Sequence, residues 1–297
     1  MRPRTVLFTA AVAVAGLGGT AFVLERASAP AAADAQRAWG DGAPGAAPGD
    51  GMIFVSGGTY RIGDDVPHAA ADAALRDVSV APFRIDRHEV TNRQFAAFVD
   101  ATGWVTTAER EGGGWVYRGG ESDWRWVRGA DWRHPLGAGS SIETAADHPV
   151  VLVSWHDARA YAEWAGKRLP TAAEWEVAAR AGIPAGTSPP SSSPDANFWQ
   201  GVWPAKNRME DGYFYTAPVG SFEPNPTGLY DMIGNVWEWT ADPYEGSTTL
   251  RVAKGGSWFC SPNYCSAYRP GFRGKSPADR GFNNVGFRCA ADAIRAS

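Results

Sequence analysis

Three segments of the chain carry hydrophobic residues at the spacing of an α-helix, and each opens with a capping box. In a capping box a Ser or Thr stands before the helix and a Gln, Glu or Asp stands three residues later, so that the two positions satisfy each other's backbone amides. These boxes begin at Thr91, Ser154 and Thr171. Each periodic stretch ends at a glycine, and the pattern predicts helices over residues 91–103, 154–166 and 171–182.

Strand patterns flank these helices. Residues 52–63 predict a strand, a Gly-Gly turn and a second strand. Residues 183–195 predict a Pro- and Ser-rich loop, after which short apolar stretches alternate with Gly, Asn and Pro and predict short strands and structured loops. Because no repeat or second linker interrupts this part, we expect one compact α+β domain over residues 51–293, with much irregular structure.

The first fifty residues differ from the rest. Residues 1–30 combine two early arginines, an uncharged run from Thr5 to Leu24 and the sequence Ala27-Ser-Ala29, which resembles a cleavage site. They predict a signal peptide or, because about 20 apolar residues can cross a bilayer, an N-terminal membrane anchor. Either one predicts an exported body: secreted, periplasmic, or anchored with the body outside the cytoplasm. Residues 31–50, rich in Ala, Gly and Pro, predict a flexible linker.

Composition and charge limit the classes of function that the chain can have. The chain has 297 residues, of which 44% are hydrophobic, and its 14 Trp and 35 Gly favour a compact fold with many tight turns. The formal charge is −4 and no basic block follows the first residues, so we expect no nucleic-acid partner. The five histidines show no metal-ligand spacing, and we interpret them as partly buried or capping groups: His68, His88, His134, His148 and His156.

Sulfur is the scarce reactive element. Two of the three cysteines, Cys260 and Cys265, are separated by four residues. That spacing permits a structural disulfide in an exported protein. It also permits a Cu(I) site, because this soft ion accepts two thiolates and can admit a third from a substrate. Zinc is disfavoured because no second pair of ligands exists. The spacing alone leaves the disulfide and the copper site open.

Motifs spread along the folded part resemble those of the formylglycine-generating enzyme (sulfatase-modifying factor) family. In chain order they are Asp131-Trp-Arg-His-Pro135, His148-Pro-Val-Val151, Trp164-Ala-Gly-Lys-Arg-Leu-Pro-Thr171, Asn197-Phe-Trp-Gln-Gly201, Gly234-Asn-Val-Trp-Glu-Trp239, Lys254-Gly-Gly-Ser257 and Gly286-Phe-Arg-Cys289. The resemblance implies that family's fold, which is related to C-type lectins.

The resemblance also implies an activity. Catalytic members hold Cu(I) with two cysteines at this position and use O2 and a thiol reductant to oxidise a cysteine to Cα-formylglycine. The substrate is an unfolded sulfatase polypeptide with the motif Cys-x-Pro-x-Arg. Cys260 and Cys265 would then bind copper, Ser257 would line the pocket, and Tyr264 and Trp237 would wall it. We expect a monomer.

Two calcium sites follow from the same resemblance, and oxygen-rich side chains suit this ion. The ligands of the first would be Asn197, the Phe198 carbonyl, Asp211 and the Tyr213 carbonyl. Those of the second would be Asp231, the Gly234 carbonyl, the Val236 carbonyl and Glu238. The alternative is that these residues only close turns.

The chain departs from the family pattern near the cysteine pair. Ser261-Pro-Asn263 replaces a usual His and Ser, and Ala267 replaces a common Arg. Two further family cysteines correspond to Ala162 and Ala178, which predicts that Cys289 is a buried thiol without a disulfide partner. The alternative function is a non-catalytic member of the same fold that binds a peptide or glycan, with Cys260 and Cys265 joined as a disulfide.

Overall fold

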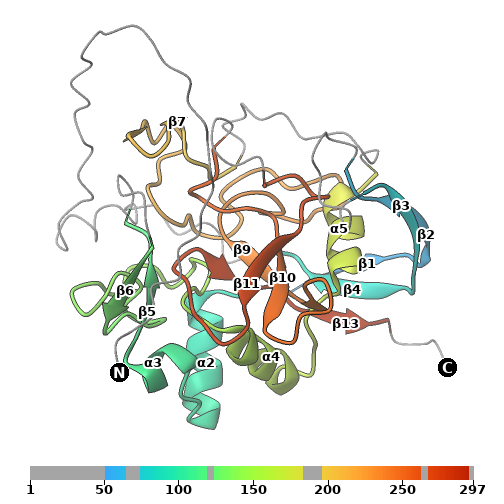
Figure 1. Cartoon of the computed structure of the whole chain (residues 1–297). Helices are drawn as coiled ribbons and strands as arrows, with labels where there is room; N and C mark the ends of the chain where they lie inside the picture. Colours follow the sequence, from blue (N-terminus) through green and yellow to red (C-terminus); the bar gives the residue numbers. More distant parts are fainter. Residues whose placement is uncertain (1–50, 65–73, 119–123, 183–195, 262–266, 294–297) are drawn as a thin grey trace, which may run out of the picture.

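The computed structural model describes residues 51–64, 74–118, 124–182, 196–261 and 267–293. Within these ranges a few short helices pack beside several small sheets, as Figure 1 shows. The predicted α+β class is confirmed. The predicted loop at 183–195 and the segments 1–30 and 31–50 lie outside the described residues. No helix of the described ranges is both long and apolar enough to span a bilayer.

The helices begin where the capping boxes predict. All three boxes form their reciprocal hydrogen bonds. The structure adds a five-residue helix that has its own capping box at Thr106 and is too short to show a hydrophobic period. The described helices are α2 (Asn92–Thr102), α3 (Thr107–Glu111), α4 (Trp155–Trp164) and α5 (Ala172–Arg180).

Two sheets form the framework. The larger has the order β11-β10-β9-β12 and crosses the middle of the molecule in Figure 1. The second has the order β1-β4-β13. Their strands are β1 (Met52–Val55), β4 (Phe83–Asp86), β9 (Trp237–Pro243), β10 (Leu250–Lys254), β11 (Gly274–Pro277), β12 (Val285–Gly286) and β13 (Ala290–Asp292).

Three two-stranded sheets complete the fold. They are formed by β2 (Gly58–Ile62) with β3 (Arg76–Val80), β5 (Gly113–Val116) with β6 (Arg125–Arg128), and β7 (Gly201–Val202) with β8 (Lys206–Asn207). The strands predicted in 52–63 are confirmed as β1 and β2, but these two strands pair with β4 and β3 and not with each other.

The hydrophobic core has two main parts. Around α2 and α4, Phe95 packs on Trp132 and Tyr161 at ring-centroid distances of 5.2 and 5.9 Å. Around α5, Trp175 and Val177 pack against the strands β2 and β4. Helix α5 thereby lies between the β2-β3 pair and the larger sheet, and it contacts both β9 and β10. This arrangement fixes the end of β10, from which the segment with Cys260 departs.

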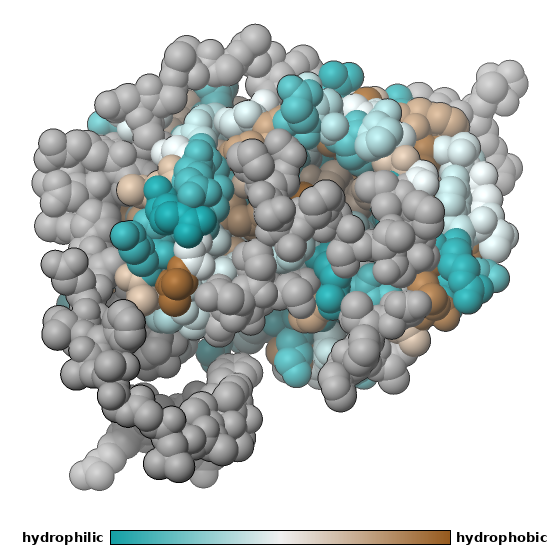
Figure 2. All heavy atoms as spheres, turned by 90° about the horizontal axis from the view of Figure 1, so that it is seen from above, coloured by the Kyte–Doolittle hydropathy of each residue, from teal (hydrophilic) through white to brown (hydrophobic). Residues whose placement is uncertain are grey.

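The described part of the surface carries both hydrophilic and hydrophobic side chains. On the face seen in Figure 2, hydrophilic groups alternate with small hydrophobic areas. The large exposed hydrophobic side chains come from separate elements: Phe54, Val105, Trp126, Trp164, Val202 and Met209.

Candidate active site and cation sites

Cys260 follows a glycine turn at the end of β10. Gly255 and Gly256 have φ angles of 93° and 74°, in the left-handed region that favours glycine. A Cβ on Gly256 would lie 2.8 Å from the Cα of Tyr268, so this position also needs glycine for the close approach of the two chain segments. Beyond the turn, the Cys260 amide donates to the Ser257 carbonyl at 2.8 Å.

The side chain of Cys260 is fully buried in an apolar cluster. Its buried neighbours are Ala196, Phe198, Ala267 and Tyr268. Trp237 and Phe272 pack against the same cluster. A sulfur in such a place is shielded from water and from hard oxygen ligands.

Ser257 and Trp237 are joined by a residue that the sequence analysis did not single out. The Asn284 side-chain amide donates to Ser257 Oγ at 3.1 Å. Its backbone carbonyl accepts from the Trp237 amide at 2.8 Å. The structure therefore brings three predicted site residues together: Cys260, Ser257 and Trp237. The other two, Cys265 and Tyr264, lie outside the described residues.

Aromatic side chains surround the segment before Cys260. The Phe259 ring lies 5.4 Å from Tyr117 and 6.1 Å from Trp124, between ring centroids. Trp203 stacks on Tyr117 at 6.0 Å. These residues come from distant parts of the sequence, and no local pattern predicts that they meet.

Cys289 is the second described cysteine, and it lies apart from this cluster. Its thiol is free, fully buried and in the core around α2 and α4. Burial first, and the neighbouring Asp86 carboxylate second, raise the pKa of Cys289 well above its ordinary value. The prediction of a buried thiol is confirmed, and a thiol held in its neutral form is a poor metal ligand.

Two side chains predicted for the first calcium site, Asn197 and Asp211, are described by the structure. The Asn197 Oδ1 atom is buried and accepts no hydrogen bond from the described residues, while its Nδ2 donates to the Tyr215 carbonyl at 2.7 Å. Asp211 accepts from the amides of Phe198 and Tyr213 at 3.2 and 3.0 Å. Burial raises the pKa of Asp211 to about 6. A buried amide oxygen and a desolvated carboxylate fit an oxygen-seeking cation.

The second set contains a carboxylate that the sequence did not suggest. Glu89 is fully buried beside the carboxylates of Asp231 and Glu238. Burial, and then the charges of Asp231 and Glu238, raise its pKa well above the ordinary value. Burial also raises the pKa of Asp231 to about 6.

One cation opposes these three carboxylates. Arg288 binds both carboxylate oxygens of Glu238 at 2.7 Å. If all four groups are ionised, three negative charges and one positive charge leave a net charge of −2, which a divalent cation would balance. The described residues hold no group of three or more His, Cys, Asp or Glu side chains spaced for a metal. A cation here would therefore also need backbone oxygens, such as those predicted at Gly234 and Val236.

Comparison with known proteins identifies the family of this chain. The family model described as "Sulfatase-modifying factor enzyme 1-like domain" matches residues 41–293. The chain belongs to the sulfatase-modifying factor family.

Individual family members are similar over most of their length. The formylglycine-generating enzyme of Thermomonospora curvata is 44% identical over 286 residues, covering 82% of this chain and 94% of its own. The inactive C-alpha-formylglycine-generating enzyme 2 of Bos taurus is 40% identical over 268 residues, covering 82% and 89%. Among solved structures, PvdO from Pseudomonas aeruginosa matches with a TM-score of 0.63 and 30% identity, covering 82% and 94%. The predicted fold family is therefore confirmed.

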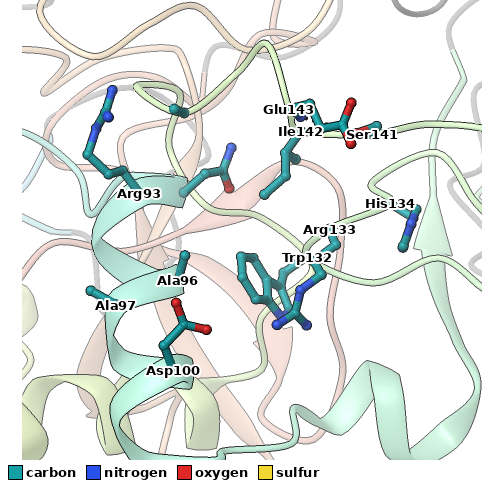
Figure 3. Close-up of a pocket in the computed structure, with 12 residues that line it drawn as sticks. Arg93, Ala96, Ala97, Asp100, Trp132, Arg133, His134, Ser141, Ile142 and Glu143 are labelled. Carbon is teal, nitrogen blue, oxygen red and sulfur yellow. Dashed lines mark hydrogen bonds between the residues drawn. The ribbon is translucent and has the colours of Figure 1, made fainter.

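One open cavity of this sulfatase-modifying factor family member lies apart from the predicted site residues. It has a volume of about 590 Å³ and lies between α2 and the loop 131–146. Figure 3 shows Trp132 beside Ala96 and Asp100 of α2, with Ile142 across from it. Arg133 stacks on Trp132 at 4.0 Å. None of the predicted site residues lines this cavity.

Proposed function

We propose that this protein oxidises a cysteine in a Cys-x-Pro-x-Arg segment of an exported sulfatase polypeptide to Cα-formylglycine. The observation that carries the proposal is the burial of Cys260 beside Ser257 and Trp237, in a family that includes a formylglycine-generating enzyme 44% identical to this chain. The fold alone does not show the function, because the inactive relative is nearly as similar to this chain in sequence.

The proposed cofactor is Cu(I), held by Cys260 and Cys265. Bound copper would supply a soft site for the substrate thiolate and a place to reduce O2. The overall conversion balances when a thiol reductant gives two electrons: the substrate CH2SH group, O2, two electrons and two protons yield the aldehyde, hydrogen sulfide and water.

The protein side chains have separate tasks in this proposal. The apolar cluster around Cys260 keeps water from the sulfur. Asn284 fixes the Ser257 hydroxyl, which would face the substrate. Trp237 would close one side of the pocket with its ring, which packs on Phe272 at a centroid distance of 6.0 Å.

Two calcium ions are part of the proposal. The unsatisfied Asn197 oxygen and the raised pKa of Asp211 support the first site. The burial of Asp231 and Glu238 beside Glu89, which raises the pKa of Glu89 and of Asp231, supports the second. The second site would stabilise the turn after β10, since the Gly234 amide donates to the Gly255 carbonyl at 2.9 Å.

The test uses a peptide with the Cys-x-Pro-x-Arg motif. Copper-loaded protein, supplied with O2 and a thiol reductant, is expected to produce the mass decrease of thiol-to-aldehyde conversion. A hydrazide probe should then label the product aldehyde. Cys260→Ala should abolish both signals, and the matched control Cys289→Ala should retain them if it folds. Unchanged peptide with copper-loaded wild-type protein would refute the activity.

The second candidate is a non-catalytic protein that binds a peptide or glycan. The inactive Bos taurus relative and the departures at residues 261, 263 and 267 favour it. In that case Cys260 and Cys265 would form a permanent disulfide. Titration of thiols in denatured protein without reductant separates the two functions, since only Cys289 would then react.

A further inference from the structure

The ring of Trp237 reaches across the larger sheet and contacts a glycine of β11. Trp237 is the first residue of β9, and β10 lies between β9 and β11, as Figure 1 shows. A Cβ on Gly274, the first residue of β11, would lie 2.6 Å from Cζ3 and 3.0 Å from Cη2 of the Trp237 ring. Carbon atoms in van der Waals contact are about 3.5–4.0 Å apart. A side chain at position 274 would therefore overlap the ring in its present place.

Small residues of β10 and β11 leave space for this ring. Gly274 lies opposite Ala253 of β10, and Ala253 lies opposite Trp239 of β9. Residues that lie opposite each other share one face of a sheet, and so do residues two positions apart on one strand. Trp237, Ala253 and Gly274 therefore belong to the same face. The indole ring crosses β10 near a methyl group and ends on a residue without a side chain.

Two further contacts restrain Trp237. Its backbone amide donates to the Asn284 carbonyl at 2.8 Å, and Trp237 pairs in parallel with Val285 of β12. The Phe272 ring lies 6.0 Å from the Trp237 ring between centroids, at an interplanar angle of 50°. The backbone of Trp237 is thus held by β12 and the residue before it, while its ring is held by Gly274 and Phe272.

The restrained ring adjoins the apolar cluster that contains Cys260. Trp237 and Phe272 both pack against this cluster, which consists of Ala196, Phe198, Cys260, Ala267 and Tyr268. Trp237 is only partly buried, so some of its surface stays open to solvent or to a ligand. A displacement of the ring away from Gly274 would therefore change the shape of the space beside the cluster.

We infer that Gly274 and Phe272 are positioning residues that hold the Trp237 ring in place as a wall of the substrate pocket. Neither residue needs to contact the substrate, because each acts through the ring. A wall that is fixed before the substrate arrives avoids the free-energy cost of ordering it on binding. The inference rests on the proposed function for the reaction performed in the pocket, whereas the position of the ring is testable without substrate.

The first experiment is fluorine NMR of protein labelled with fluorotryptophan, without metal or substrate. Each of the 14 tryptophans contributes a resonance, and Trp237→Phe identifies the one from Trp237 by its loss. Gly274→Ala is expected to move this resonance, because the added methyl group must displace the ring by about 1 Å. Gly58→Ala is the matched control in β2, where a Cβ would lie 3.5 Å from Tyr60 Cε2 in ordinary contact. An unmoved Trp237 resonance in Gly274→Ala would overturn the inference.

The second experiment measures kcat/KM with a Cys-x-Pro-x-Arg peptide at a temperature where every variant is folded. Gly274→Ala should lower kcat/KM by about tenfold, a size typical of the coupling between residues in contact. Phe272→Leu should cause a smaller loss, because it leaves the glycine in place, and Gly58→Ala should cause none.

A double-mutant cycle shows whether Gly274 acts through Trp237. In the Trp237→Phe background, Gly274→Ala should lower kcat/KM little further, because the smaller phenyl ring reaches less far towards β11. An equal loss in both backgrounds would mean that Gly274 acts independently of Trp237 and would overturn the inference. Absence of activity in copper-loaded wild-type protein would instead refute the proposed function, and the fluorine NMR result would still show whether Gly274 positions the ring.

Discussion

Arg288 and Glu238 form a two-pronged ion pair in which both side chains are fully buried and both contacts measure 2.7 Å. Glu238 also accepts from the Trp175 indole at 2.7 Å. The pair connects β9 to the chain segment between β12 and β13. It thereby holds together the sheet that carries the candidate site.

Arg288→Met is expected to destabilise the protein by about 3–5 kcal/mol, because it leaves Glu238 buried without its partner. Chemical denaturation measures the loss. The control is Arg208→Met, which breaks a pair with Glu210 whose two side chains are each 55% exposed and should matter far less. Adding Glu238→Gln to Arg288→Met should recover part of the stability, because the second change removes the unpaired buried charge. If Arg288→Met destabilises the protein no more than Arg208→Met does, the buried ion pair does not have the assigned role.

Calcium is expected to stabilise the protein more at pH 7 than at pH 5. The folded pKa of Asp211 is raised to about 6 from 3.8, so the folded state prefers the protonated form and loses stability as the pH rises through this range. At pH 7 a cation offsets that cost, whereas at pH 5 it must first displace the proton.

Thermal unfolding with and without calcium measures this difference. At pH 7, calcium at 100 times its dissociation constant should raise the free energy of unfolding by about 3 kcal/mol. Asp211→Asn should lose much of the gain, while the exposed neighbour Glu210→Gln keeps it. Equal stabilisation at both pH values would argue against a site built on Asp211.

His148 should make the protein less stable in acid. Burial lowers its pKa to about 4 from 6.5, and its Nδ1 lies 2.9 Å from Thr216 Oγ1. A depressed histidine pKa means that the unfolded state binds the proton more tightly. The stabilisation is therefore complete above pH 6.5 and declines as the pH falls towards 4, by up to about 3 kcal/mol.

The measurement compares the free energy of unfolding at pH 7 and pH 4.5 for wild-type protein and His148→Gln, both without calcium. The variant should lose less stability between the two pH values, since its side chain does not titrate. His156→Gln, at an exposed position, is the matched control and should behave like the wild type. An identical pH dependence in His148→Gln would exclude this histidine as a source of acid sensitivity.

Local features were predictable from the sequence. A capping box depends on residues three positions apart, and the three boxes and the stop of α2 at Gly103 all formed as predicted. Cys289 was also predictable, because a small apolar thiol without a partner is usually buried. The motifs also indicated the family, and the match of the family model to residues 41–293 confirms it.

Long-range contacts were not predictable in the same way. β1 and β2 are adjacent in sequence but bind different strands. Glutamate side chains are usually exposed, and only the fold shows that Glu89 is buried near Asp231 and Glu238. Asn284 contacts both Ser257, which lies 27 positions earlier in the chain, and Trp237, which lies 47 positions earlier. No periodic pattern in the sequence indicates such a residue.

Cu(I) titration of the reduced protein measures whether Cys260 and Cys265 bind a metal ion as a pair of thiolates. We expect one tightly bound ion per chain in the wild type and in Cys289→Ala, and none of comparable affinity in Cys260→Ala or Cys265→Ala. Equal Cu(I) binding with and without Cys260, or no tight binding in fully reduced wild-type protein, would rule out a copper site formed by these two cysteines.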